Sequence, residues 1–181
     1  MSKKKKNKNT KWIITITLLA FTISFVFSLI SEITLSKVGL IIGIIILLLF
    51  IGLGIIFDMI GVAVTAGTES PLNAMSAKKI KGAKKAVSFK KNADKVSSFC
   101  NDVIGDICGI ISGSAGVTIT ANISKTYNLD IFWVGLIITA VVAALTIGGK
   151  AICKSIAMKK SKEIVYFTAK IMSVFDKKQK N

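Results

Sequence analysis

The chain has 181 residues, of which 52% are hydrophobic, and a formal net charge of +16. This composition is more apolar than that of a typical soluble domain. Histidine is absent and every basic residue is a lysine. Imidazole metal ligation and His-assisted nucleophilic catalysis are therefore excluded, and we expect neither an enzyme nor an organic cofactor. The absence of Arg and of aromatics interleaved with basic residues argues against a nucleic-acid partner.

Two apolar runs follow a basic tail at residues 1–11. The run at 12–30 is longer than the hydrophobic region of most signal peptides and lacks a clear cleavage site. It predicts a retained transmembrane helix, with a cleaved signal peptide as the alternative. The next span, 38–66, carries no charge up to residue 57, and it is long enough to cross the ~30 Å hydrocarbon core. Gly, Ser and Pro in "GTESP" predict where this helix ends.

The second half of the chain alternates between basic and apolar segments. Residues 72–98 carry eight lysines and predict an amphipathic helical hairpin at a membrane surface, broken near 89–92. Apolar segments at about 100–123 and 131–149 predict two further spans. Residues 158–181 predict a juxtamembrane amphipathic helix and tail. Its apolar residues recur at helical spacing: Ile164, Phe167, Ile171 and Val174.

The predicted fold class is all-α: a polytopic membrane protein with four transmembrane helices, a cytoplasmic amphipathic helical hairpin and a C-terminal juxtamembrane helix. Four spans separate five hydrophilic segments, and alternate segments hold 23 and 2 of the lysines. The positive-inside rule therefore places both termini and the hairpin in the cytoplasm. We expect a bacterial cell (inner or plasma) membrane, with the lysines against the anionic headgroups of the lipid bilayer.

Two carboxylates interrupt the span at 100–123. On an α-helix, Asp102 and Asp106 share a face about 6 Å apart along the axis. One interpretation is that Asp102 is interfacial and that Asp106 pairs with Lys150 or a nearby lysine. The other is an oxygen-rich site for a hard cation such as Mg²⁺. Six side chains would line that cation site, with the three carboxylates as direct metal ligands: Thr65, Thr68, Glu69, Asn101, Asp102 and Asp106.

The order of four motifs resembles that of a known family. A span ends in "AGTESPLNAMSA" (66–77), a basic hairpin follows, the next span carries "GIISGSAG" (109–116), and the last ends in "GKAICKSIA" (149–157). This is similar to the transmembrane (DUF21) domain of the CNNM/CorC/CorB magnesium-transport family. The resemblance covers roughly 45–175 and defines a DUF21-like domain at 38–157. It implies dehydrated Mg²⁺ as the bound or transported ion, held by polar groups of the first two core spans, and a homodimer or a heterodimer with a family member.

The resemblance carries over residue by residue. Thr68 and Glu69 stand where the family has serine and glutamate. Asn101, Asp102 and Asp106 fall near its asparagines. Three residues match the motif that ends the family's third core span: Gly149, Lys154 and Ala157.

The chain also departs from the family pattern. Lys150 replaces the family's glutamate and Cys153 its proline. The span at 12–30 is extra, and no CBS domains are expected. A lysine beside the pathway would repel cations, whereas aspartates in place of asparagines would attract them.

Two functions remain open. The first is a divalent-cation (Mg²⁺) transporter of the CNNM/CorC type, reduced to its membrane domain. The second is a non-transporting accessory or regulatory subunit that pairs with a full-length relative.

Overall fold

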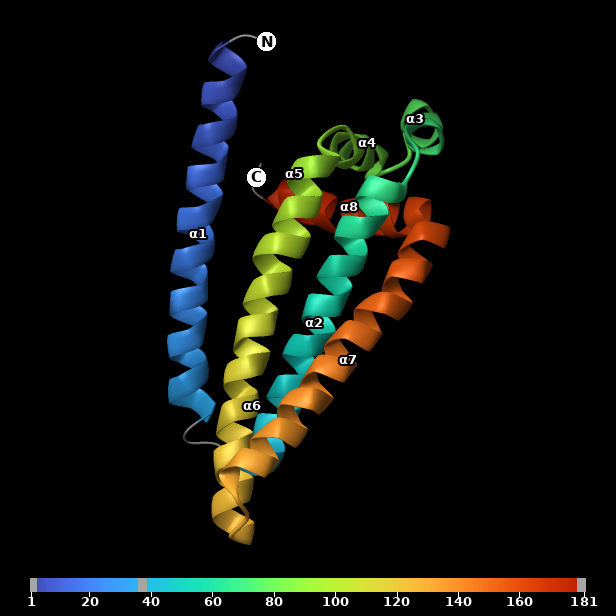
Figure 1. Ribbon diagram of the computed structural model, residues 1–181. Coiled ribbons are helices and arrows are strands. Elements are labelled where there is room, and N and C mark those ends of the chain that lie inside the picture. Colours follow the sequence, from blue (N-terminus) through green and yellow to red (C-terminus); the bar gives the residue numbers. More distant parts are fainter. Residues whose placement is uncertain (1–2, 36–38, 179–181) are drawn as a thin grey trace. The chain divides into compact units, whose positions relative to one another are not determined.

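The computed structural model describes residues 3–35 and 39–178, and every regular element in these ranges is a helix (Figure 1). Four stretches are long and apolar enough to cross a membrane: Ile13–Ile30, Leu40–Ala66, Ala93–Tyr127 and Ile131–Lys159. The predicted all-α class with four membrane-spanning helices is therefore confirmed. In chain order the elements are α1 (Lys3–Leu35), α2 (Leu40–Ala66), α3 (Glu69–Ala77), α4 (Ala83–Lys91), α5 (Ala93–Ser98), the π-helix η1 (Phe99–Gly105), α6 (Asp106–Tyr127), α7 (Ile131–Lys159) and α8 (Ser161–Lys178).

The helix boundaries differ from the predicted spans mainly at their ends. α1 begins at Lys3, so most of the segment expected as a solvated tail is already helical. α2 has 27 residues, which at 1.5 Å per residue is about 40 Å and exceeds the ~30 Å hydrocarbon core. The third span starts at Ala93 rather than near residue 100, because α5, η1 and α6 follow one another without a break.

The chain forms two compact units, which are described separately. The first comprises Met1–Ile51 and Asp106–Ala143, and the second comprises Gly52–Gly105 and Ala144–Asn181. In the first unit α1 contacts α6 (Figure 1). In the same unit α6 also lies against α7.

Small residues bring α6 and α7 together in the first unit. A Cβ on Gly135 would lie 3.5 Å from the Thr120 methyl group, and one on Gly116 would lie 3.8 Å from Ile138. Ser112 and Thr120 donate their hydroxyl hydrogens to helix carbonyls four residues earlier, at 2.7 and 2.8 Å. Their polar groups are thus satisfied within the helix, as an apolar environment requires.

Alanine and valine side chains, with one leucine, form the core of the second unit. They come from the ends of α2 and α7 and from α3, α4 and α8. The fully covered members are Ala63, Val64, Leu72, Ala86, Ala157, Val165 and Ala169. Because these side chains are small, the helices that carry them can pack closely.

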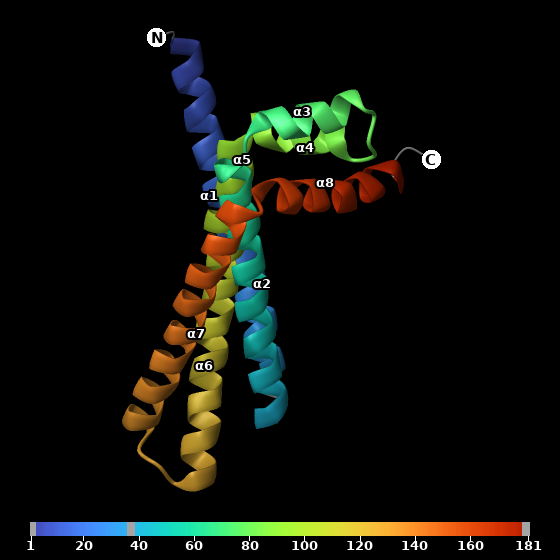
Figure 2. The same ribbon diagram turned by 90° about the vertical axis from the view of Figure 1, so that its right-hand side faces the viewer.

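α3 and α4 form a hairpin that packs on α8 (Figure 2). Its turn lies at residues 78–82, and a second interruption at Asn92 separates α4 from α5, within the break predicted near 89–92. Gly82 ends this turn with φ +88°, and a Cβ there would lie 2.9 Å from the Lys170 Cα. The Tyr166 hydroxyl donates a hydrogen bond of 3.3 Å to the Lys81 carbonyl. Both contacts attach the turn to α8.

Lys90 of α4 binds the C-terminal end of α2. Its ammonium donates hydrogen bonds of 3.0 and 2.8 Å to the carbonyl oxygens of Val64 and Thr65. These carbonyls lie in the last turn of the helix, where no further turn provides backbone donors. A cation at a helix C-terminus also interacts favourably with the helix dipole. Lys90 therefore fixes the hairpin to the last turn of α2.

Candidate functional site

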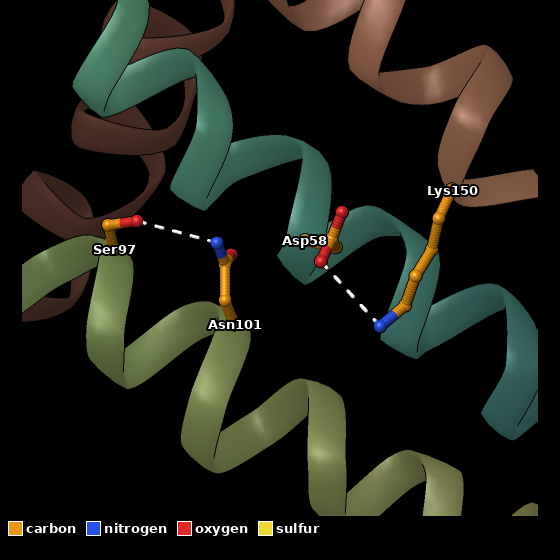
Figure 3. Close-up of polar contacts among 4 residues, drawn as sticks. All are labelled: Asp58, Ser97, Asn101 and Lys150. Carbon is orange, nitrogen blue, oxygen red and sulfur yellow. Dashed lines mark hydrogen bonds and ion pairs between the residues drawn. The ribbon is translucent and has the colours of Figure 1, made fainter. Parts of the chain in front are cut away.

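An ion pair joins α2 and α7 inside the second unit. The Lys150 ammonium lies 3.6 Å from the Asp58 carboxylate (Figure 3). Asp58 is eight residues from the end of α2 and Lys150 nine from the end of α7, which corresponds to about 12 and 14 Å along the helices. A Cβ on Gly105 would lie 3.9 Å from the same ammonium. The glycine thus leaves room for the lysine beside η1.

Asn101 of η1 faces α2 one turn further along that helix. A Cβ on Gly61 would collide with the Asn101 side-chain oxygen, so a side chain at this position would displace the carboxamide. The carboxamide nitrogen donates to the Ser97 hydroxyl at 3.4 Å (Figure 3). The carboxamide oxygen is buried and accepts no hydrogen bond. Such an oxygen is rare in folded proteins, because leaving a buried polar group unpaired costs about 1–3 kcal/mol.

The two predicted aspartates have different surroundings from Asn101. Asp102 is exposed and accepts a hydrogen bond of 2.7 Å from the Ser98 hydroxyl. Asp106 is also exposed and begins α6. A π-helix, and not the α-helix assumed from the sequence, carries Asp102 and extends to Gly105. π-Helical turns inside α-helices are frequent at functional sites.

The remaining predicted ligands lie at the junction of α2 and α3. Thr65 donates its hydroxyl hydrogen to the Val62 carbonyl at 2.9 Å, so only its oxygen lone pairs are left for a ligand. Thr68 is the N-cap residue of α3, with extended backbone and no side-chain capping bond. Glu69 is the first residue of α3 and is exposed. A carboxylate in this first turn is favourable for the helix dipole.

Within residues 3–35 and 39–178, no three Asp, Glu or Cys side chains gather closely enough to hold a metal ion. A cation site in this chain would therefore need hydroxyl, carboxamide or carbonyl oxygens beside any carboxylate. The assignment of Glu69, Asp102 and Asp106 as metal ligands stays a prediction. Of the polar groups that α2, η1 and α7 bring together in the second unit, the predictions included Asn101 and Lys150.

Sequence reasoning missed two polar residues of this region. Asp58 lies within an apolar run, and its partner Lys150 is 92 positions away, so no local spacing indicated the pair. The isolation of the carboxylate was itself a usable signal, because a charge inside a membrane span usually has a partner. Lys90 was counted among the lysines of a basic surface, and nothing in its spacing distinguishes it.

The motifs carried over from the family are distributed along α2, α3, η1, α6 and α7. Ala157 is fully buried in the core of the second unit, Lys154 is exposed and Cys153 is half-buried. Gly149 lies so close to α2 that a Cβ there would collide with the Ile55 side chain. The last of these motifs therefore lies where α7 packs against α2.

Comparison with known proteins agrees with this arrangement. The family model described as "Cyclin M transmembrane N-terminal domain", or CNNM, matches residues 44–177. Searches of curated proteins and of solved structures returned no significant match. The matched region contains most of the second span, the third and fourth spans, the α3–α4 hairpin and most of α8. The chain is a membrane protein and belongs to the CNNM transmembrane-domain family.

Proposed function

We propose that the chain is a divalent-cation transporter of the CNNM/CorC type, with Mg²⁺ as its substrate. The observation that carries this proposal is the buried, unpaired carboxamide oxygen of Asn101 on a π-helix within a membrane-spanning segment. Amide and carbonyl oxygens are ligands that hard cations accept. A cation at this oxygen would offset the cost of burying it without a hydrogen bond. We also propose that five further side chains contact the transported cation: Thr65, Thr68, Glu69, Asp102 and Asp106.

The Asp58–Lys150 ion pair bears on the alternative function. Lys150 already neutralises Asp58, so this carboxylate attracts a divalent cation less than an unpaired one would. This observation favours a non-transporting subunit that pairs with a full-length relative. The two functions make opposite predictions for flux through the chain alone.

Mg²⁺ flux into proteoliposomes tests the proposal. We expect the wild-type protein to carry Mg²⁺ down an imposed gradient. Asn101→Leu, which keeps the volume but removes the oxygen, should lower the flux by at least about tenfold, the equivalent of about 1.4 kcal/mol. Asn122→Leu makes the same change in the same span and should leave flux unchanged. Asp102→Asn and Asp106→Asn test the two predicted carboxylate ligands.

Zero flux from the wild type across a range of Mg²⁺ gradients and pH values would eliminate the transporter proposal. The accessory function would then be tested with Lys150→Gln, which frees the Asp58 carboxylate. A gain of flux in that variant indicates that the lysine alone blocks an otherwise complete path. Copurification of the wild type with a full-length relative would support the subunit function directly.

Orientation and assembly complete the proposal. We propose that both termini face the cytoplasm of a bacterial cell, because 23 of the 25 lysines fall in alternate hydrophilic segments. A reporter that functions only in the cytoplasm should then be active when it is fused to the C-terminus. We also propose a homodimer or a heterodimer with a family member, and cross-linking in native membranes tests it.

A further inference from the structure

The C-terminal helix α8 has two apolar faces, and only one of them is covered. Val165 and Ala169 are buried in the core of the second unit, where α3 and α4 pack. Phe167, Ile171 and Val174 are 64%, 44% and 52% exposed. At about 100° per residue these three lie within about 60° of one another, and roughly opposite Val165 and Ala169. The exposed face therefore points away from the hairpin.

The course of α8 gives the direction of that exposed face. α7 is a membrane-spanning candidate that ends at Lys159, and α8 begins two residues later and runs crosswise to it (Figure 2). A helix in this position lies close to the bilayer surface and parallel to it. The hairpin lies on one side of α8 and the end of α7 extends from the other (Figure 2). The uncovered face is thus on the side of the membrane.

Charge complementarity identifies what covers the face. Lys159 and Lys160 are exposed directly before α8, and Lys170 is exposed along its flank. Lys162 is also exposed and lies 4.0 Å from Glu163, so these two charges offset each other. An apolar stripe bordered by lysines is the pattern of a helix that lies in the interface of an anionic bilayer.

We propose that the outer face of α8, formed by Phe167, Ile171 and Val174, binds the surface of the bilayer through anionic phospholipids. The opposite face holds the α3–α4 hairpin, which forms a second layer and does not itself enter the bilayer. This places α8 as a spacer between lipid and hairpin, in contrast to a hairpin that lies directly on the membrane. The proposal is independent of whether the chain carries cations.

Tryptophan quenching by brominated lipid tests this proposal on the full chain. The native tryptophans, Trp12 and Trp133, are replaced by phenylalanine, and one reporter is then introduced as Phe167→Trp. Ser88→Trp is the matched control, because Ser88 is exposed on the hairpin and lies away from the buried Ala86. Each protein is placed in nanodiscs that contain phosphatidylcholine brominated near the headgroup, with or without phosphatidylglycerol.

We expect the Phe167→Trp reporter to emit at shorter wavelength and to be quenched several times more strongly than the Ser88→Trp reporter. Phosphatidylglycerol should increase that quenching, and replacement of Lys159, Lys160 and Lys170 by glutamine should abolish the increase. A reporter that emits as in water and is unquenched overturns the proposal. So does a reporter that is shielded from water but unquenched, because protein would then cover the face.

Two further results complete the test. Equal quenching of the two reporters overturns the layered order of lipid, α8 and hairpin. Equal quenching of the Phe167→Trp reporter with and without phosphatidylglycerol overturns the role of the anionic lipid. Ile171→Trp serves as a second reporter if Phe167→Trp prevents a monodisperse preparation.

Discussion

The Asp58–Lys150 pair yields a sharp prediction about stability, because each charge neutralises the other inside a membrane-spanning region. Lys150→Met removes the ammonium and keeps most of the side-chain volume. Asp58→Asn removes the other charge with almost no change of shape. We expect each single variant to be less stable than the wild type, and the double variant to recover most of the loss. The two substitutions thus form a double-mutant cycle.

The expected loss of unfolding free energy follows from how deep the ion pair lies in the membrane and how exposed its side chains are. Removing one partner of a fully buried pair costs about 3–5 kcal/mol, because the other charge is left without compensation. Here the side chains of Lys150 and Asp58 are 33% and 19% exposed, which reduces the cost. If α2 is centred, its helix of about 40 Å overhangs a ~30 Å core by about 5 Å at each end. Asp58 then lies about 7 Å inside the hydrocarbon, where a carboxylate costs less than the ~2.5–3.5 kcal/mol at the midplane. We therefore expect Lys150→Met to lower the free energy of unfolding by about 1–3 kcal/mol.

Unfolding by sodium dodecyl sulfate in mixed micelles, followed by circular dichroism, measures this difference. Lys154→Met is the control, because Lys154 is exposed one turn further along α7. The cycle should give a coupling free energy of about 1–2 kcal/mol between positions 58 and 150, within the range found for residues in contact. The reasoning is refuted if Lys150→Met unfolds at the wild-type detergent fraction, or if the double variant loses the sum of the two single losses.

Three further predictions use the same unfolding assay. Lys90→Met removes two hydrogen bonds to the last turn of α2 and should cost about 1–2 kcal/mol, whereas its exposed neighbour Lys91→Met should cost nothing measurable. Gly82→Ala combines a left-handed backbone with a close approach to α8, so we expect a loss of at least about 1–2 kcal/mol and faster proteolysis within the α3–α4 hairpin. Gly148→Ala has open space around it and should be neutral, and an equal effect of these two glycine changes would contradict the steric argument. Gly61→Ala pushes against the Asn101 carboxamide and should lower the free energy of unfolding by about 1–3 kcal/mol. The same change should lower Mg²⁺ flux, and normal flux would contradict the proposed role of the carboxamide oxygen.

The sequence was sufficient for the spans, because runs of 18 or more apolar residues have few alternatives to a membrane helix. It was insufficient for what depends on contacts between distant residues. The pairing of Asp58 with Lys150 is one case, and the second face of α8 is another. Val165 and Ala169 lie opposite Phe167, but they are small, and the larger apolar residues at helical spacing gave the clearer pattern in the sequence.

The candidate site was likewise predictable from the sequence only in part. The family motifs drew attention to Asn101, but its unpaired oxygen follows from how η1 lies against Gly61, and no motif encodes that contact. The break predicted near 89–92 is present where Asn92 separates α4 from α5, but the turn at 78–82 was not predicted, because its lysines did not distinguish it from the rest of the basic segment. The position of the turn at 78–82 depends on the docking of the hairpin on α8.

The π-helix η1 has a consequence for the comparison of relatives. A π-helix bonds each residue to the fifth one along and not the fourth, so it holds one residue more than an α-helix would need between the same flanking faces. Deletion of a single residue between 99 and 105 would convert the segment to ordinary α-helix and leave α5 and α6 in register with their neighbours. Alignments of this span should therefore permit a one-residue gap at η1, and the asparagines of other family members should be matched to Asn101 only after that gap has been considered.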